Sequence, residues 1–173
     1  MKASLACLAG LLVLAATGLA EEANGLRLTA QKTLLEKDKD RDQFYEWDKV
    51  EKALGLKVAA RNISFKDLPE GTLEYTVIVK RWGRTPELFE SYTGSEKLPA
   101  LVKGAEANLT IARVPLGGWE IGGNRKQFQD SIEGWQVIAK HGGAETIKIT
   151  STAAFEKLLP KAKPGKIKRA KED

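Results

Sequence analysis

The sequence has little of what most enzymes and metal proteins use for chemistry. Its 173 residues include one cysteine, Cys7, and one histidine, His141. A single cysteine excludes an intrachain disulfide and a cysteine-rich metal site. A serine–histidine–aspartate site, a cysteine–histidine site and nearly any zinc site would need His141. That histidine stands beside Gly142 and Gly143 at a predicted turn, and we interpret it as an exposed turn residue. Hydrolytic and zinc chemistry are therefore not expected.

The first 20 residues predict a secretory signal peptide. Lys2 gives a positive start, an apolar run follows from Leu5 to Ala16, and small residues lead to Ala20. The run is shorter than the about 20 residues of a membrane span, so we expect cleavage after Ala20 rather than a transmembrane anchor. Cys7 lies near the start of this run, whereas a lipidated cysteine would follow it. We expect a thiol-free mature chain that is exported to the periplasm or the extracellular space.

Positive charge is concentrated at the C-terminus. Residues 161–173 hold six basic and two acidic side chains, a net charge of +4, while the whole chain has +5. Removal of Lys2 with the signal leaves +4, so the body of the chain is close to neutral. We predict a domain over residues 21–160 and a disordered basic tail over 161–173. The tail is expected to be a solvated segment, although clustered Lys and Arg also suit an anionic polymer or lipid.

The middle of the chain predicts β-strands. Leu54, Leu56, Val58 and Ala60 alternate with smaller or polar residues, and a second alternating segment runs from Leu73 to Lys80. This period of two is typical of a strand with one buried face. The link Asp67–Gly71 contains Pro and Gly, as turns do. Because two such strands leave an apolar face uncovered, the rest of the chain must supply a second layer.

The remaining segments predict further short strands and loops. Strands are expected from Leu26 to about Glu36, from Leu88 to Tyr92, from Ala107 to Val114, and in a hairpin from Trp135 to Ile149, with helix or strand at Ala153 to Leu159. The mixed charge run Glu36–Asp42 predicts a solvated loop. Phe44–Val50 suggests an extended lead with a bulge near Lys52–Gly55, or one helical turn at Glu51–Leu54. Pro115 is expected to end its strand. The glycines around Trp119 in Leu116–Asn124 are expected to leave it no strand position, so that it is either an exposed contact residue or an anchor of its loop.

Seven or so short strands without a long amphipathic helix predict an all-β fold, a single antiparallel two-sheet sandwich. In this pattern residues 26–159 resemble immunoglobulin-like and fibronectin-III-like domains, with Trp82 or Trp135 as the central core tryptophan. The chain lacks the paired cysteines of true immunoglobulin domains. It also resembles small exported sandwich proteins of bacterial envelopes, some of which accompany pilus or adhesion machinery. That resemblance implies a partner-binding role.

No motif predicts a cofactor or a metal. Asp38, Asp40 and Asp42 have the spacing of the first ligands of a calcium loop, but Gln43 and Lys49 stand where Gly and an acid are required. The glycine pairs lack the Lys and Ser/Thr of a phosphate loop. Acidic residues are too numerous to single out a catalytic pair. Asn62 and Asn108 begin formal glycosylation sequons.

The sequence therefore predicts a non-enzymatic binding module without a cofactor. Its partner would be a protein or a surface polymer and not nucleic acid, which an exported protein rarely meets. An unpaired strand edge would be the docking element, and we expect Leu88–Tyr92 and the loop Gly117–Asn124 near that surface. The alternative is a carbohydrate-binding module that stacks sugars on exposed aromatic rings. A carboxylate-pair hydrolase is a third, less favoured class. The candidate partner-binding residues are Trp119, Phe89, Tyr92, Tyr45 and Trp47.

Overall fold

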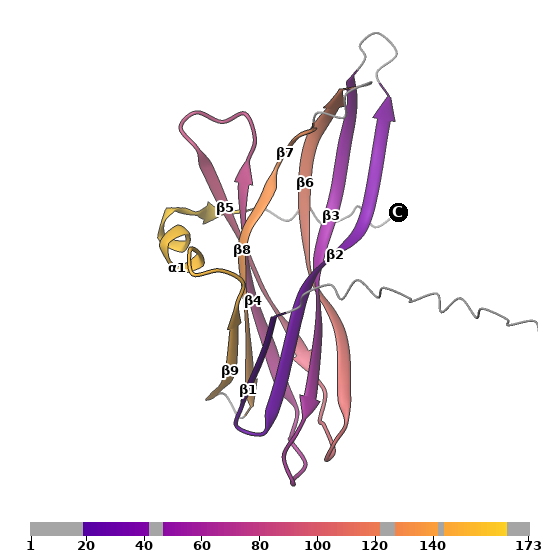
Figure 1. Ribbon diagram of the computed structural model, residues 1–173, viewed down its shortest axis with the longest axis vertical. Helices are drawn as coiled ribbons and strands as arrows, with labels where there is room; N and C mark the ends of the chain where they lie inside the picture. The colour runs from indigo at the N-terminus through magenta and orange to yellow at the C-terminus, as the bar shows by residue number, and fades with distance from the viewer. Residues whose placement is uncertain (1–18, 42–46, 122–126, 142–143, 166–173) are drawn as a thin grey trace, which may run out of the picture.

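The computed structural model describes residues 19–41, 47–121, 127–141 and 144–165. The described chain forms two five-stranded sheets that pack face to face, with one short helical turn. The first sheet has the strand order β1-β2-β3-β6-β7 and the second has β10-β5-β4-β8-β9. Figure 1 shows an elongated sandwich whose two sheets lie close together in the lower half and diverge in the upper half. The predicted all-β, two-sheet sandwich is confirmed, with ten described strands in place of about seven.

The strands of the first sheet are long. They are β1 (Leu19–Ala23), β2 (Leu26–Arg41), β3 (Trp47–Asn62), β6 (Glu106–Ile121) and β7 (Gln127–Gln129). The second sheet holds β4 (Gly71–Arg81), β5 (Leu88–Leu98), β8 (Ser131–His141), β9 (Ala144–Thr150) and β10 (Lys163–Pro164). All pairings are antiparallel except β10 with β5, which is parallel. The helical turns are α1 (Phe155–Leu158) and η1 (Leu159–Lys161), so Ala153–Leu159 contains helix and not a strand.

The two alternating segments in the middle of the chain lie in different sheets. β3 pairs with β2 and β6, whereas β4 pairs with β5 and β8. The Pro- and Gly-containing link between them therefore crosses from one layer to the other. On each of the two strands, the alternate apolar residues face the other sheet. Leu56 and Val58 of β3 and Val77 and Val79 of β4 are each at most 1% exposed.

The core lies in the lower half, where both sheets are apolar on their inner faces. Leu26 and Leu28 of β2 are fully buried and belong to one cluster with residues of both sheets. Trp135 of β8 is 4% exposed and is the core tryptophan. Trp82 is 45% exposed, so the prediction that it was the alternative core residue is wrong. It falls after the end of β4, where its ring packs against Phe128 at the edge of the first sheet and stays partly exposed.

Two predicted interruptions of the first sheet are wrong. The charge run is not a loop, because Glu36–Arg41 continues β2 and pairs residue by residue with β3. Pro115 does not end β6, because Pro115 pairs with Ala53 and the strand continues to Ile121. The predicted bulge near Lys52–Gly55 is confirmed, because the register of β3 against β6 shifts between Leu54 and Leu56. The alternative prediction of a helical turn there is wrong.

The second sheet also extends beyond its predicted limits. β5 continues through Thr93–Ser95 to Leu98, so that the expected stop at Gly94 is absent. The chain beyond Pro160 is placed as far as Gly165: Lys163–Pro164 pair with Glu90–Ser91, and the Gly165 amide donates to the Ser91 carbonyl at 2.8 Å. Gly165 lies against the Tyr92 ring, where a Cβ would come within 2.6 Å of it. Of the predicted disordered tail, residues 161–165 are therefore ordered, and 166–173 lie outside the described residues.

Candidate functional site

On the β1 side of the first sheet, β2 has a long edge that no described strand pairs. β2 has 16 residues, and β1 pairs only with its first five, Leu26–Ala30. From Gln31 to Arg41, no strand of the described chain pairs with this edge. Leu34 and Leu35 on the same stretch are 55% and 38% exposed. We call Gln31–Leu35 the open edge. Its backbone offers hydrogen-bonding groups to an added strand.

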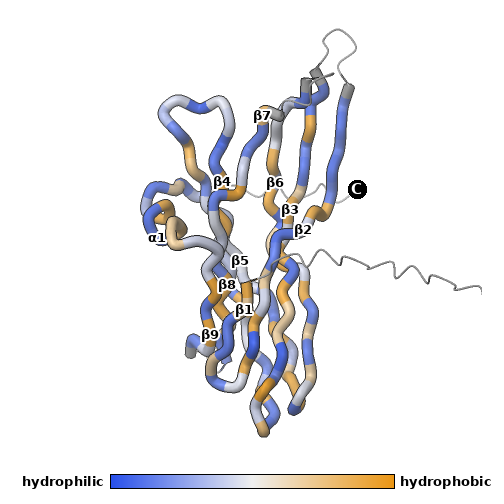
Figure 2. The backbone as a smooth tube through the Cα atoms, in the orientation of Figure 1, coloured by the Kyte–Doolittle hydropathy of each residue, from blue (hydrophilic) through white to orange (hydrophobic). Residues whose placement is uncertain are grey.

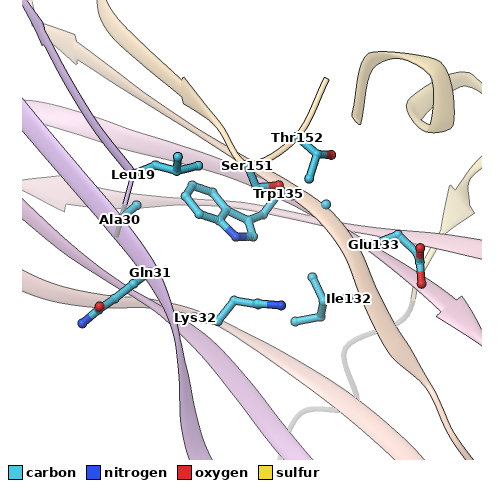
Figure 3. Close-up of a pocket in the computed structure, with 10 residues that line it drawn as sticks. Leu19, Ala30, Gln31, Lys32, Ile132, Glu133, Trp135, Ser151 and Thr152 are labelled. Carbon is cyan, nitrogen blue, oxygen red and sulfur yellow. Dashed lines mark hydrogen bonds between the residues drawn. The ribbon is translucent and has the colours of Figure 1, made fainter. Parts of the chain in front are cut away.

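A pocket of about 290 Å³ lies at the first residue of β1. Leu19, the first residue of β1, pairs with Ala30, and both line the pocket together with Gln31 and Lys32 of the open edge. The second sheet supplies the opposite wall through residues of β8 and the two residues after β9: Ile132, Glu133, Gly134, Trp135, Ser151 and Thr152. In Figure 3 the indole of Trp135 occupies the centre, between Leu19 and Ala30 on one side and Lys32 and Ile132 on the other. The pocket thus lies between the sheets, next to the open edge.

The chemistry of the pocket is that of a binding surface. Its lining has one carboxylate, Glu133, and one ammonium, Lys32. Ser151 is committed to the fold, because its Oγ accepts from the Trp135 amide at 2.7 Å and its own amide donates to the Trp135 carbonyl at 2.8 Å. Ligand pockets usually measure about 300–1,000 Å³. A cavity at the lower end of that range suits one or two apolar side chains of a polypeptide.

Beyond the open edge, β2 carries alternating charges from Glu36 to Asp40. Lys39 Nζ lies 2.6 Å from Asp48 Oδ2 and 3.2 Å from Glu120 Oε2. The hydrogen bonds to Asp48 and Glu120 raise the pKa of Lys39, and the bond from Lys39 lowers the pKa of Glu120. If two copies paired antiparallel about a two-fold axis here, Asp38 would face Asp38 or Lys39 would face Lys39. Like charges directly opposite are destabilising, so this part of the edge is protected against self-pairing.

A row of aromatic rings lies at the other side of the first sheet. Trp119 of β6 pairs with Phe128 of β7 and with Lys49 of β3. The Phe128 ring lies 5.2 Å from the Trp82 ring, centroid to centroid, at an interplanar angle of 47°. Trp119 therefore has a strand position, and the expectation that its glycine neighbours would deny it one is wrong. Trp119 and Phe128 are half-buried and Trp82 is exposed.

Of the other predicted contact residues, Phe89 and Tyr92 belong to the second sheet, whereas Trp119 belongs to the first. Phe89 lies on β5 and is half-buried, whereas Tyr92 is 2% exposed and belongs to the core. Tyr45 lies outside the described residues. Trp47 is described only as the first residue of β3, opposite Ile121. The predicted docking edge Leu88–Tyr92 is in part occupied by the chain itself, through β10 at Glu90–Ser91.

Tyr92 is part of a charged cluster that joins the two sheets where they begin to diverge. Arg81 donates to Glu90 Oε2 at 2.7 Å, to Asp130 Oδ2 at 2.5 Å, to the Pro115 carbonyl at 3.1 Å and to the Tyr92 hydroxyl. Desolvation opposes the charge of Glu90, but hydrogen bonds from Arg81 and Tyr92 outweigh it and lower the pKa of Glu90. Burial and the bond to Glu90 raise the pKa of Tyr92 to about 12. This cluster is structural and faces no pocket lining.

His141 is not the exposed turn residue that we expected. Its ring is half-buried against the β3–β4 link: Nδ1 lies 2.9 Å from the Pro69 carbonyl, and Nε2 is buried without a hydrogen-bond partner. The described residues contain no group of three or more His, Cys, Asp or Glu side chains that could hold a metal. Asp42 of the rejected calcium spacing lies outside the described residues, and Asp38 and Asp40 are on β2.

The sequence reasoning missed the open edge and its pocket. One signal was present: Leu34 and Leu35 are adjacent apolar residues at the point where the alternation of the first strand breaks, which is where the structure has a bulge. The role of Trp135 in the pocket could not be predicted, because the wall opposite Ala30 comes from a different sheet.

Comparisons with known proteins add little to this geometry. No protein-family description matches the chain, and no curated protein matches it. Among solved structures, a protein from Akkermansia muciniphila is similar at 10% sequence identity and a TM-score of 0.37, with 85% of each chain covered. In the described part of the chain, no helix has the length and apolar composition needed to cross a bilayer. The fold and the site together define a two-sheet β-sandwich with an open strand edge beside an interlayer pocket.

Proposed function

We propose that this chain is an exported, non-enzymatic binding module that docks an extended segment of a partner protein along the open edge of β2. The observation that carries the proposal is the edge at Gln31–Leu35, which no strand of the described chain pairs, with a pocket directly beside it. An added strand gains main-chain hydrogen bonds, and a pocket for alternate side chains gives specificity. We also propose that this module works in an envelope assembly. Its fold, in the same proposal, is immunoglobulin-like or fibronectin-III-like.

The predicted signal cleavage would enlarge the proposed docking site. A cut after Ala20 would remove two residues of β1, Leu19 and Ala20, which pair with Ala30 and Thr29. Leu19 also lines the pocket. The open edge would then begin at Thr29, and the pocket would lose Leu19 from its lining. We therefore expect the chain that begins at Glu21 to bind its partner more tightly than the uncut chain.

Site-specific photo-crosslinking in the native envelope tests the proposal. Benzoylphenylalanine at Leu34, on the open edge, should give one discrete higher-mass product after irradiation. The same label at Lys148, an exposed position on β9, is the control and should give none. Changing Lys32, at the mouth of the pocket, to Glu should weaken the product at Leu34. Equal products from both labelled positions, or none from either, would contradict docking at β2.

A second candidate function, carbohydrate binding, is favoured by the row of rings Trp119, Phe128 and Trp82. Adjacent exposed aromatic faces can stack on sugar rings. Tryptophan fluorescence titrated with mucin, peptidoglycan fragments and plant glycans measures this directly. If sugars bind at the row, Trp82→Ala should abolish the response while the Leu34 crosslink remains. No response to any glycan in the unchanged protein would exclude this candidate.

A further inference from the structure

Two connections at the lower end of the sandwich carry the most exposed large apolar side chains of the described residues. Phe65 is 89% exposed and Val102 is 61% exposed, and Ile63 beside them is 41% exposed. Ile63 and Phe65 lie in the β3–β4 link, and Val102 lies between β5 and β6. We call residues 63–70 and 99–105 the tip. Figures 1 and 2 show these turns projecting at the lower end, with hydrophobic segments among them. An exposed apolar patch usually marks a contact surface.

The tip is held rigid by a buried asparagine. Asn62 is 0% exposed, and its Nδ2 donates to the carbonyls of Lys66 at 2.8 Å and Leu101 at 2.9 Å. Its Oδ1 accepts from the amide and the hydroxyl of Ser64 at 2.9 and 2.7 Å. Leu68 and Leu101 exchange backbone hydrogen bonds of 2.9 and 3.0 Å. These backbone polar groups are satisfied from within, so an incoming surface need not supply hydrogen bonds to them.

The charges of the tip favour an anionic surface. Lys103 Nζ lies 5.1 Å from the centroid of the Phe65 ring, so an ammonium group borders the most exposed apolar side chain. Lys66 follows Phe65 by one residue. The tip also has two acids: Asp67 Oδ1 accepts from the Lys103 amide at 2.9 Å, and Glu70 Oε2 lies 2.8 Å from Lys97 Nζ. Lys66, Lys103 and the adjacent Lys97 outnumber these two acids by one charge.

We propose that the tip inserts shallowly into a membrane surface that contains anionic lipid. A hydrocarbon phase accepts backbone only where its polar groups are already paired, and the internal hydrogen bonds around Asn62 pair the groups of Lys66, Leu68 and Leu101 in advance. Phe65, Val102 and Ile63 would enter the boundary between headgroups and acyl chains. The long stems of Lys66 and Lys103 would keep their ammonium groups among the phosphates. Binding is then the sum of apolar burial and attraction to anionic headgroups.

Vesicle co-sedimentation of the full chain tests this inference. The protein should sediment with vesicles of phosphatidylcholine and phosphatidylglycerol, and more weakly with phosphatidylcholine alone or at high salt. Phe65→Ala should lower the apparent partition coefficient about tenfold or more, because burial of a Phe side chain is lost. Leu159→Ala, which removes an apolar side chain of η1 that is 38% exposed, is the matched control and should leave the partition coefficient unchanged. Both positions are exposed, so both variants should keep the melting temperature.

A second measurement separates the tip from the basic C-terminal residues. With Cys7→Ser, a Val102→Cys variant can be labelled with an environment-sensitive dye, whose emission should shift to the blue when anionic vesicles are added. No sedimentation with anionic vesicles at low salt would overturn the proposal. Full binding by Phe65→Ala without a dye shift would also overturn it, and would assign the binding to the tail. Loss of the dye shift on addition of a soluble envelope protein would assign the tip to a protein partner instead.

Discussion

The two halves of the long strands β2, β3 and β6 differ in composition although their backbones pair alike. Below the bulges, Leu28, Val58 and Ala60 face the second sheet and are fully buried. Above the bulges, the same strands carry Lys37, Lys39 and Asp48, and lysines of β2 form ion pairs with acids of the neighbouring strands. The lower half is held by apolar burial, whereas the upper half has few buried apolar side chains, Val50 and Leu116 among them, and is held mainly by main-chain pairing with surface charges. A strand that begins over the main core can therefore continue beyond it.

The largest effect is expected from a cavity in the lower half. Leu56→Ala removes a side chain that is 1% exposed and should lower the free energy of unfolding by about 2–5 kcal/mol. Lys49→Ala in the upper half removes only a surface ion pair with Glu51 and should stay within about 0.5 kcal/mol. Urea denaturation measures both. Equal losses would show that the two halves are stabilised in the same way.

A somewhat smaller loss is expected at the lower end. Asn62→Ala leaves the carbonyls of Lys66 and Leu101 without their side-chain donor and should cost about 2–3 kcal/mol. Asn108→Ala is the matched control, because Asn108 is exposed and bonds only to Glu106. The same comparison bears on the two glycosylation sequons, since a fully buried Asn62 cannot carry a glycan in this fold. Similar melting temperatures for the two variants would refute the role given to Asn62.

The junction between the halves should respond next. Asp130→Ala removes a carboxylate that binds Arg81 and accepts from the amides of Trp82 and Gly117 at 2.9 Å. Because the Arg81 side chain is 19% exposed, solvent screens part of the loss, and about 1–3 kcal/mol is expected. Glu87→Ala, which breaks the exposed pair with Lys80, should cost less than about 1 kcal/mol. A reversed order of the two losses would contradict the account of the junction.

The same cluster predicts a dependence on alkaline pH. The pKa of Tyr92 is raised from 10.0 to about 12 in the folded protein, so the folded state holds this proton more firmly than the unfolded state. The associated stability is present below pH 10 and is lost as the pH rises toward 12. Tyr92→Phe cannot titrate, so the difference in unfolding free energy between it and the unchanged protein should shrink across that window. A constant difference would mean that the pKa is not raised.

The smallest effect on stability is expected at the open edge. Leu34→Asp changes a side chain that is 55% exposed, and the free energy of unfolding should move by less than about 0.5 kcal/mol. The Leu34 position would then affect docking alone. A large loss of stability, measured by thermal unfolding, would show that Leu34 stabilises the fold and would contradict its assignment to a binding surface.

The sequence predicted those strands in which burial imposes an alternation. The segments Leu54–Ala60, Leu73–Lys80 and Trp135–Ile149 were found as expected, because each turns every second residue toward a core. The strand Glu36–Arg41 could not be predicted from polarity, since the side chains of Glu36–Asp40 are exposed and the pairing with β3 is made by the backbone. Pro115 is tolerated within β6 because β7 pairs only with Gly118–Glu120, and the edge of β6 is free of a described strand at Pro115.

The sequence predicted the kind of docking element but not its position in the fold. An unpaired strand edge was expected to dock a partner, but it was assigned to Leu88–Tyr92, where the chain's own residues Lys163–Gly165 pair with β5. Which edge stays open depends on pairings between segments that are distant in sequence. For the same reason, Trp119 and Phe128 could be recognised as neighbours only once β6 and β7 were paired.

Amide hydrogen exchange of the complex with a crosslinked or co-purified partner tests docking at β2 most directly. The account predicts that binding slows exchange across residues 31–35, while exchange in β9, an edge strand of the second sheet, stays as in the free protein. Slowed exchange confined to β9 or to β5, with residues 31–35 unchanged, would contradict it.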